Sequence, residues 1–362
     1  MKKELFYISA HFPSNRVPVA GQKLCWTHLQ KLAKEYEVHL FSYVNDLEAK
    51  YFNEEDFCFC KSIYFYRLTD KIRFKNYIKN INLPVKISGR YDRKAIQYII
   101  TIIREKKISI VHIEFTSLIY LGKILKEIFP KLEIVIVQHD VTFQALKRIS
   151  ENALNPLKKG LFLFEYFRQK KYELSNLVFF DKIYVLNEKD KIILENFDLE
   201  KPIQVWYPDM GTIVNRKEVL IEPYSIMFLG AMHRKENIDA VNWFIDDILP
   251  TLSETFTALN FYIVGSNPSP KIKTASNVII TGFVEDLNDY FSKTDIAVVP
   301  LRMGAGISIK TIEMQKAGLP IFSTNVGLEG VIKDKSKILI QVDTVEEFID
   351  AISNYFNKKY NS

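Results

Sequence analysis

Short apolar runs alternate along the whole chain with stretches of helical periodicity. The runs that we interpret as strands are Glu4–Ala10, Glu37–Val44, Ile108–Glu114, Glu133–Gln138 and Lys182–Leu186, then Ser225–Gly230, Leu259–Gly265, Val278–Gly282 and Ile296–Pro300. Nearly uninterrupted apolar strands separated by helices are typical of parallel sheets that helices cover on both faces. The sequence therefore predicts an α/β protein.

Helices are predicted between these strands from apolar positions three and four residues apart. The clearest are 237–252, with Ile238, Val241 and Ile245 on one face, and the stretch from Ile307 to Ala317. Gly318 and Pro320 follow the second of these, and glycine then proline is a common end for a helix. A last helical pattern covers Val345–Tyr360.

The chain has 362 residues, which at about 150 residues per domain indicates two domains. The alternation runs independently in each half, and a polar stretch that follows Val205 separates them. We expect two doubly wound, Rossmann-like domains, 1–205 and 206–345, facing each other across a cleft, with 346–362 forming a helix that packs back toward the first domain. In such sheets ligands bind at the carboxyl ends of the strands.

Charge is distributed unevenly between the two halves. Residues 1–205 contain 34 Lys and Arg against 24 Asp and Glu, whereas the remainder contains 15 against 19. A basic first half beside a slightly acidic second half suggests that one domain faces an anionic partner. The overall composition, 48% hydrophobic and 25% charged, excludes a disordered or fibrous chain.

The three cysteines and the start of the chain favour a reduced, cytoplasmic protein. Cysteines are few and odd in number, at Cys25, Cys58 and Cys60. Cys58 and Cys60 have no second ligand pair at metal-binding spacing, so we expect two buried thiols. The first apolar run contains Glu4 and is too short for a signal peptide, and no apolar stretch is long enough to span a membrane.

The most informative segment is 298–320, in which a strand is followed by a small-residue loop and a helix. The loop is Gly304-Ala305-Gly306, and its bare backbone N–H groups at a helix start are suited to binding a diphosphate. Lys310 would add positive charge, and Glu313, on the same helical face, could accept hydrogen bonds from both hydroxyls of a ribose. A G-x-G alone would indicate only a tight turn with a surface Lys–Glu pair.

The order of motifs in the second half resembles the nucleotide-sugar-binding domain of family 4 glycosyltransferases, which have the GT-B fold. The motifs are Phe228–Met232, Tyr262–Gly265, Thr281–Val284, Asp295–Pro300 and the loop with Lys310 and Glu313, followed by Ala317-Gly-Leu-Pro320 and Ser323–Gly327. The resemblance implies a retaining glycosyltransferase that uses a nucleotide-diphosphate sugar and needs no bound metal or other cofactor.

The same resemblance implies roles for individual residues of the second half. Glu313 should bind the donor ribose, Phe283 and Val284 should flank the base, and the backbone of Gly304, Ala305, Gly306 and Ile307 should contact the diphosphate or sugar, with Lys310 beside them. A basic residue that binds phosphate is either Arg234 or Lys235, and the spacing does not decide between them. A solvated basic loop is the alternative for both.

One departure from the family pattern concerns the donor sugar. Many members carry two glutamates separated by seven residues, and the position of the first is occupied here by Ala305. The contact with the sugar must therefore differ. This departure keeps open a second hypothesis, a catalytically silent subunit that binds a nucleotide sugar or acts as a scaffold in a glycan-assembly complex.

In the first half the resemblance is weaker and indicates three residues. Gly21 matches the family's glycine loop near the donor phosphates and the acceptor. His139 follows a strand and matches a histidine near the donor sugar, so it is our candidate catalytic residue, and a structural role is the alternative. Glu114 also ends a strand and is a candidate for acceptor binding or for a structural cap.

Two basic segments of the first half suggest a surface for anionic partners. One runs from Lys71 to Lys94, and the other, Lys158–Lys171, mixes lysines with aromatic residues. Both could lie on a membrane that carries a lipid-linked acceptor, and the alternative for the second is a core helix with a solvated basic face. Nucleic acid is not expected, because no nucleic-acid-binding motif is present.

We therefore expect a glycosyltransferase that moves a hexose-type sugar from a nucleotide donor to a glycan or lipid-linked acceptor in bacterial surface polysaccharide synthesis. It would act in the cytoplasm, peripherally on the inner face of the membrane. Nucleotide-sugar epimerases and inverting transferases of the same fold place different residues after the corresponding strand, and the K-x-x-E and A-G-x-P pattern argues against them.

Overall fold

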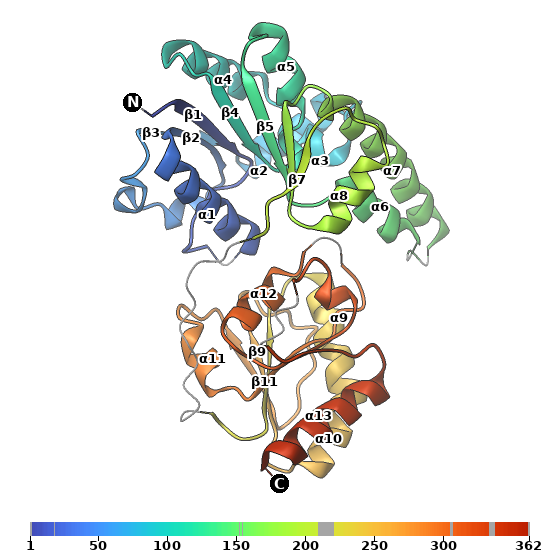
Figure 1. Ribbon diagram of the computed structural model, residues 1–362. Coiled ribbons are helices and arrows are strands. Elements are labelled where there is room, and N and C mark those ends of the chain that lie inside the picture. Colours follow the sequence, from blue (N-terminus) through green and yellow to red (C-terminus); the bar gives the residue numbers. More distant parts are fainter. Residues whose placement is uncertain are drawn as a thin grey trace. The chain divides into compact units, whose positions relative to one another are not determined.

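A computed structural model describes residues 2–17, 19–151, 153, 155–208, 221–304, 307–332 and 337–360. The chain divides into two compact units, residues 1–209 and 210–362 (Figure 1). The division lies four residues beyond the expected position at 205. Each unit contains one fully parallel sheet with helices packed on it.

The sheet of the first unit has seven strands in the order β3-β2-β1-β4-β5-β6-β7. The strands are β1 (Glu4–Ser9), β2 (Glu37–Val44), β3 (Ser62–Arg67), β4 (Ile110–Glu114), β5 (Glu133–Gln138), β6 (Lys182–Val185) and β7 (Ile203–Val205). The order reverses between β1 and β4, where Ser9 lies opposite Glu114. This is the Rossmann-type arrangement, and its reversal point is where such sheets bind ligands.

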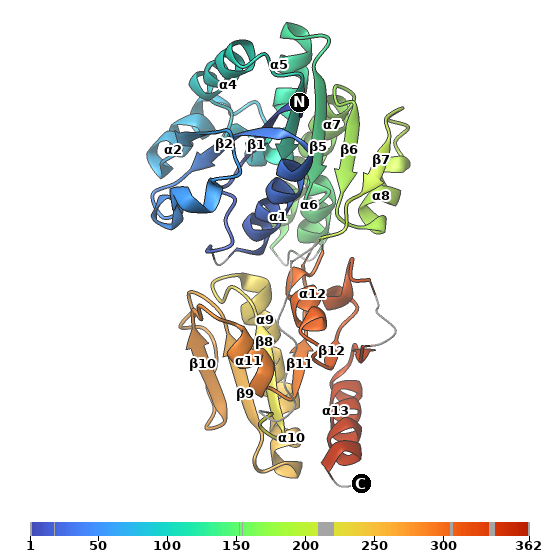
Figure 2. The same cartoon turned by 60° about the vertical axis from the view of Figure 1, so that its left-hand side comes forward.

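Helices connect consecutive strands of this unit and cover both faces of its sheet (Figure 2). They are α1 (Ala20–Glu35), α2 (Asp70–Lys79), α3 (Val85–Ser88), α4 (Arg93–Glu105), α5 (Tyr120–Ile128), α6 (Thr142–Glu151), α7 (Pro156–Leu177) and α8 (Glu188–Glu195).

Alternate residues of β1 show how the two faces are filled. Leu5 and Tyr7 pack in one apolar cluster with Trp26 of α1, whereas Phe6 and Ile8 pack in another with residues of α4 and α5. Because successive side chains of a strand point to opposite faces, a central strand must be apolar at every position.

The second unit repeats the arrangement with six strands in the order β10-β9-β8-β11-β12-β13. The strands are β8 (Ser225–Leu229), β9 (Asn260–Val264), β10 (Val278–Gly282), β11 (Ile296–Val299), β12 (Ile321–Ser323) and β13 (Leu339–Gln341), and the helices are α9 (Lys235–Trp243), α10 (Leu249–Thr255), α11 (Asn288–Lys293), α12 (Ile309–Lys316) and α13 (Val345–Tyr360). The order reverses between β8 and β11.

All nine strands predicted from apolar runs are present, and so is β12, because the order of motifs indicated a strand between Pro320 and Ser323. Strands β3, β7 and β13 were not predicted. The predicted helix 237–252 begins two residues earlier, at Lys235, and is divided by a π-helical turn at Phe244–Ile248.

The last helix, α13, is part of the second unit. The predicted domain boundary at residue 345, which left this helix outside that domain, was therefore wrong. Its buried side chains, Phe348, Ile352 and Phe356, are part of the unit's single apolar core. Lys359 and Tyr360 also bond to the two carboxylate oxygens of Asp295, each at 2.7 Å. A contact of this helix with the first domain stays a prediction.

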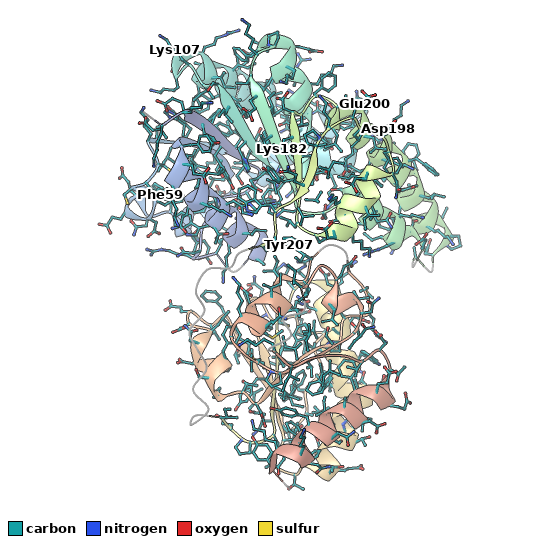
Figure 3. The ribbon with its side chains drawn as sticks, viewed as in Figure 1. Phe59, Lys107, Lys182, Asp198, Glu200 and Tyr207 are labelled. Atoms are coloured by element: carbon teal, nitrogen blue, oxygen red, sulfur yellow. The ribbon has the colours of Figure 1, made fainter. Side chains whose placement is uncertain are left out.

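Turns that precede strands contain residues with left-handed backbone angles. Lys107 has φ 50°, and Asp198 and Glu200 have φ 43° and 50°; Figure 3 labels all three. Lys107 precedes β4, and the other two precede β7. No helix within the described ranges is both long and apolar enough to cross a bilayer.

A buried carboxyl group, Glu173, lies on α7 against the end of β5. Its two oxygens accept hydrogen bonds from the Nε2 atoms of Gln138, at 2.8 Å, and Gln169, at 3.0 Å. Burial raises the pKa of Glu173 to about 8, because these hydrogen bonds do not offset the loss of water, and the charge of Asp140 acts in the same direction as burial. The folded protein therefore holds a proton on Glu173 at neutral pH.

This proton makes stability depend on pH. A carboxyl group has a pKa near 4.3 in the unfolded chain, so the contribution of Glu173 is complete below about pH 4 and is lost as the pH rises through about 8, at up to about 1.4 kcal/mol per pH unit. We expect Glu173→Gln to remove this loss, so that denaturant unfolding at pH 5, 7 and 9 shows a smaller decline than in the wild type. Glu127→Gln, at an exposed position, is the control. Equal declines in wild type and Glu173→Gln would contradict the assignment.

Candidate functional site

The ends of three adjacent strands of the second unit, β8, β9 and β10, contact one another through the backbone of glycines. Gly265, after β9, has φ +149°, and a Cβ on it would lie 1.8 Å from the carbonyl oxygen of Gly230, which follows β8. The Gly265 N–H in turn donates to the oxygen of Gly282 at 3.1 Å. A side chain at Gly265 would collide with main chain, so these turns can pack together only with glycine there.

Lys310, in the first turn of α12, points at this edge. Its Nζ donates to Oδ1 of Asn237 and lies 4.5 Å from the centre of the Phe228 ring. A Cβ on Gly230 would lie 3.1 Å from the same Nζ. Asn237 is itself fixed, because its Nδ2 donates to the oxygen of Ala231 at 2.9 Å.

The surroundings of Lys310 make its charge sensitive to an anion. Burial and, to a smaller extent, the charge of Arg234 lower the pKa of Lys310 to about 7, although Glu236 and Glu313 act in the opposite direction. The amine is therefore close to half-protonated at neutral pH. An anion beside it would favour the charged ammonium form.

Hydrogen bonds join the start of α12 to the loop that follows β12. The Ser308 hydroxyl lies 2.8 Å from that of Thr311, which donates to the oxygen of Gly327 at 2.7 Å. Ser308 N–H also donates to the Glu329 oxygen at 3.1 Å. A Cβ on Gly327 would lie 2.3 Å from Ser323 Oγ, so this close approach needs glycine as well.

The predicted donor-site residues of the loop and helix fall as follows. Gly304 is exposed with φ +154°, Ile307 is half-buried just before the helix, and Glu313 is half-buried one turn after Lys310. Ala305 and Gly306 lie outside the described residues.

The remaining candidates of this unit lie after β8 and β10. Arg234 and Lys235 are exposed at the first residues of α9, and Arg234 forms an ion pair with Glu236. Only Arg234 contributes to the lowered pKa of Lys310. Phe283 is 51% exposed, whereas Val284 packs against the core and leaves mainly its backbone for a ligand.

In the first unit a single buried carboxylate, Glu114, accepts hydrogen bonds from several elements. Its Oε1 lies 2.9 Å from Nδ1 of His28 and 3.0 Å from Nε2 of His112, and its Oε2 lies 2.7 Å from Nε2 of His139. The hydroxyl of Tyr7 lies 2.9 Å from Oε1. Glu114 thus links α1, β1, β4 and the end of β5 at the point where the strand order reverses.

These contacts keep Glu114 ionised. Burial alone would raise its pKa, but the charge of His28 and hydrogen bonds from the three histidines hold the pKa of Glu114 well below its usual range. Burial lowers the pKa of His28, whereas the charge of Glu114 acts in the opposite direction.

His139 and Gly21 lie beside each other in the first unit. The His139 ring stacks on Phe115 with centroids 3.9 Å apart, and its Nδ1 is 3.7 Å from the place of a Cβ on Gly21. Since Nε2 is bonded to Glu114, Nδ1 is the ring atom left for a ligand. Glu114 has no exposed surface, so it supports His139 and is not placed to bind an acceptor directly.

One group of described residues has the geometry to hold a metal ion, namely Cys25, Glu114 and His139, whose ligand atoms lie within 4.8 Å of one another. The chemistry of the group fits poorly. Burial and the charge of Glu114 raise the pKa of the Cys25 thiol well above its usual value, whereas metals bind the thiolate. That no metal is needed stays a prediction.

The structure adds residues that the sequence analysis missed and corrects one expectation. His28, His112 and Asn237 were not predicted, although His112 lies two residues before Glu114 and must share its face of the strand. Cys58 was expected to be buried and is exposed, because it follows the short 3₁₀ helix Glu54–Phe57, which buries only Phe57.

Comparison with known proteins shows which family the second unit resembles. Residues 223–358 match the family described as Glycosyl transferases group 1. The match covers most of the second unit, which is similar to a group 1 glycosyltransferase domain. The protein is accordingly a glycosyltransferase, and its two Rossmann-like units are those of the GT-B fold, as the sequence predicted.

Several known proteins are similar to this glycosyltransferase in sequence or in fold over most of its length. An uncharacterized 44.6 kDa protein in the cps region of Klebsiella pneumoniae is 23% identical over 82% of this chain and 76% of its own. Among solved structures, TarM is similar with a TM-score of 0.69 at 10% identity, covering 99% and 92% of the two chains. An α,α-trehalose-phosphate synthase (UDP-forming) from Burkholderia xenovorans, in complex with glucose-6-phosphate, gives 0.60 at 10%, covering 98% and 92%.

The Glu114 network yields a stability prediction. Glu114→Gln keeps the shape but offers one acceptor oxygen and an N–H₂ group to several donors, so we expect the first unit to lose about 3 kcal/mol of unfolding free energy. Denaturant unfolding followed by tryptophan fluorescence would measure this, since Trp206 stacks on His28 with centroids 4.1 Å apart. Glu127→Gln should change stability by less than about 0.5 kcal/mol. A Glu114→Gln protein as stable as wild type would show that the carboxylate is not the ionised centre of the network.

Proposed function

We propose that this glycosyltransferase retains anomeric configuration and transfers a hexose-type sugar from a nucleotide-diphosphate donor to a glycan or lipid-linked acceptor. The setting is bacterial surface polysaccharide synthesis, which the relative in a cps region supports. The protein would act in the cytoplasm, peripherally at the inner face of the membrane, and without a bound metal.

The observation that carries the proposal is the half-buried Lys310, held by Asn237 beside the backbone of Gly230. A leaving diphosphate gains negative charge as the bond to the sugar breaks. A positive group that is fixed in place and partly removed from water stabilises that charge more strongly than a solvated one. In this proposal Lys310, the start of α12 and Arg234 or Lys235 supply what a metal ion would otherwise provide.

Other residues hold the rest of the donor in this proposal. Glu313 accepts hydrogen bonds from the ribose hydroxyls, and the backbone from Gly304 through Ala305 and Gly306 to Ile307 contacts the diphosphate or sugar. Exposed Phe283 stacks beside the base, and Val284 contributes main chain. The ring Nδ1 of His139 accepts a hydrogen bond from a sugar hydroxyl that reaches Gly21.

The chemistry is a front-face displacement. The bond from the anomeric carbon to the diphosphate oxygen breaks, and the bond to the acceptor oxygen forms on the same face. The acceptor proton passes to the departing diphosphate oxygen, so the step needs no protein nucleophile. This explains how a site with Ala305 in place of the family's first glutamate could still be active.

Nucleotide binding tests the donor site. We expect one nucleoside diphosphate among UDP, GDP, ADP and dTDP, with CMP included as a monophosphate, to raise the melting temperature of the purified protein by about 3–5 °C at roughly 100 times its Kd. Glu313→Ala should abolish the shift, and Glu346→Ala, at an exposed position of α13, should keep it. No shift with any nucleotide or nucleotide sugar would refute the donor site.

The catalytically silent alternative predicts binding without turnover. Incubation with the matching nucleotide sugar and a lipid extract from the source cells should release nucleoside diphosphate if the protein is active. Binding that depends on Glu313 but is never accompanied by release would favour the silent or scaffold subunit.

The pKa of Lys310 gives a pH dependence for binding. The free amine has a pKa of about 7, and a bound diphosphate would raise it, so affinity should be greatest below pH 7 and fall as the pH rises from about 7 to 9. Lys310→Met should weaken binding about ten-fold or more at pH 7 and flatten the pH profile. Calorimetry in two buffers of different ionisation enthalpy would show proton uptake in the wild type and in the exposed control Lys337→Met. A flat profile for wild type would exclude this role.

A further inference from the structure

Two stripes of exposed, large apolar side chains occur in the first unit. On α2 and the link that follows it, Phe74, Ile78, Ile81 and Val85 are between 53% and 77% exposed. In the helix the first two are four residues apart, which places them on one face. Single exposed apolar residues are common, but a run of this kind on consecutive turns is unusual for a surface that faces only water.

The second stripe lies on the amino-terminal half of α7. Leu157, Leu161 and Phe164 are 80%, 66% and 59% exposed and follow one another four and three residues apart. The sequence alone favoured a core helix with a solvated basic face, and the structure buries a different, mainly polar set further along α7, including Gln169 and Glu173. This half of α7 therefore presents its apolar stripe outward.

Hydrogen bonds join the two stripes into one surface. Arg168, on the α7 stripe, donates to the oxygens of Ile81 at 2.8 Å and Leu83 at 2.6 Å. Glu165 accepts from the backbone N–H of Val85 at 3.0 Å and pairs with Arg168. We call the combined surface the α2–α7 face, made of Phe74, Ile78, Ile81, Val85, Leu157, Leu161 and Phe164.

Lysines surround this face. Six exposed lysines occur within three residues of its apolar members: Lys71, Lys75, Lys79, Lys86, Lys158 and Lys159. The acidic residues near them are Asp70 and Glu165, and the second is already paired with Arg168. The face thus combines a large apolar area with a net positive rim.

We propose that the α2–α7 face binds the surface of an anionic lipid bilayer. Apolar side chains would enter the boundary between head groups and acyl chains, while lysines extend their ammonium groups to anionic head groups. Each lysine near such a surface contributes about a five-fold increase in partitioning. A second copy of this chain fits less well, because a self-association would bring these lysines toward one another.

The face also adjoins the carboxyl edge of the sheet. Arg90 donates to Nε2 of His11, which follows β1, at 2.6 Å, and Arg73, next to Phe74 on α2, is close enough to affect the pKa of both residues. The proposal does not rest on sugar transfer, because vesicle binding needs no donor.

Vesicle flotation of the full-length protein tests the proposal. We expect binding to vesicles of phosphatidylcholine with 30% phosphatidylglycerol, and little binding to pure phosphatidylcholine or at 1 M salt. Lys75→Glu/Lys158→Glu should lower partitioning at least about 25-fold, and Leu161→Ser/Phe164→Ser at least about ten-fold.

Matched controls remove similar groups elsewhere on the same unit. Lys106→Glu/Lys131→Glu changes two exposed lysines before β4 and β5, and Ile192→Ser changes a 57% exposed side chain on α8. Both should bind vesicles like wild type. Absence of binding by the wild type, or equal loss in the controls, would overturn the proposal. So would a concentration-dependent dimer in ultracentrifugation that Leu161→Ser/Phe164→Ser abolishes while vesicle binding persists, since the face would then serve self-association.

Discussion

The reversal of strand order at the centre of each sheet is the constraint on which both candidate sites depend. Right-handed crossovers carry the chain to opposite faces of the sheet on either side of this point. The loops after the two central strands therefore diverge and leave the strand ends uncovered. In the first unit those strands are β1 and β4, and in the second they are β8 and β11. Glu114 is the last residue of β4, opposite Ser9 of β1, and the Nζ of Lys310 lies near Gly230, which follows β8.

The two units use this opening in opposite ways. The first unit closes it with a buried carboxylate, Glu114, which polar side chains from three other elements contact. In the described part of the second unit, glycines lie at the ends of the adjacent strands β8, β9 and β10, and the Nζ of Lys310 lies near Gly230. These backbone groups and this amine are what we propose for binding the donor, whereas the hydrogen bonds of Glu114 fix the ring of His139.

The sequence was sufficient for those parts that depend on local patterns. Strands with a long apolar run were predicted to within two residues of the observed bounds, and for β2 and β5 the bounds agree, because burial on both faces favours that composition. Strands β7 and β13 are three residues long and were not predicted, since so short a run carries no periodicity. Glu313 and Lys310 were singled out through motif order, which also indicated a glycosyltransferase of the GT-B fold.

The sequence alone could not predict which residues far apart in the chain would become hydrogen-bond partners. That Asn237 would hold Lys310, 73 positions away, depends on how α9 and α12 pack against β8. In the same way, nothing in the spacing of two basic segments 80 residues apart showed that Arg168 would bond to the link after α2. Such contacts arise from the tertiary fold, and only the fold can show which charged residues end as neighbours.

The π-helical turn at Phe244–Ile248 has a consequence for the donor site. A π turn contains about one residue more than an α turn, so it shifts the phase of everything that follows by roughly 100°. The segment before it carries Asn237, and the segment after it buries Leu249 and Leu252 in the core. The extra residue lets one continuous helical rod satisfy two orientations at once.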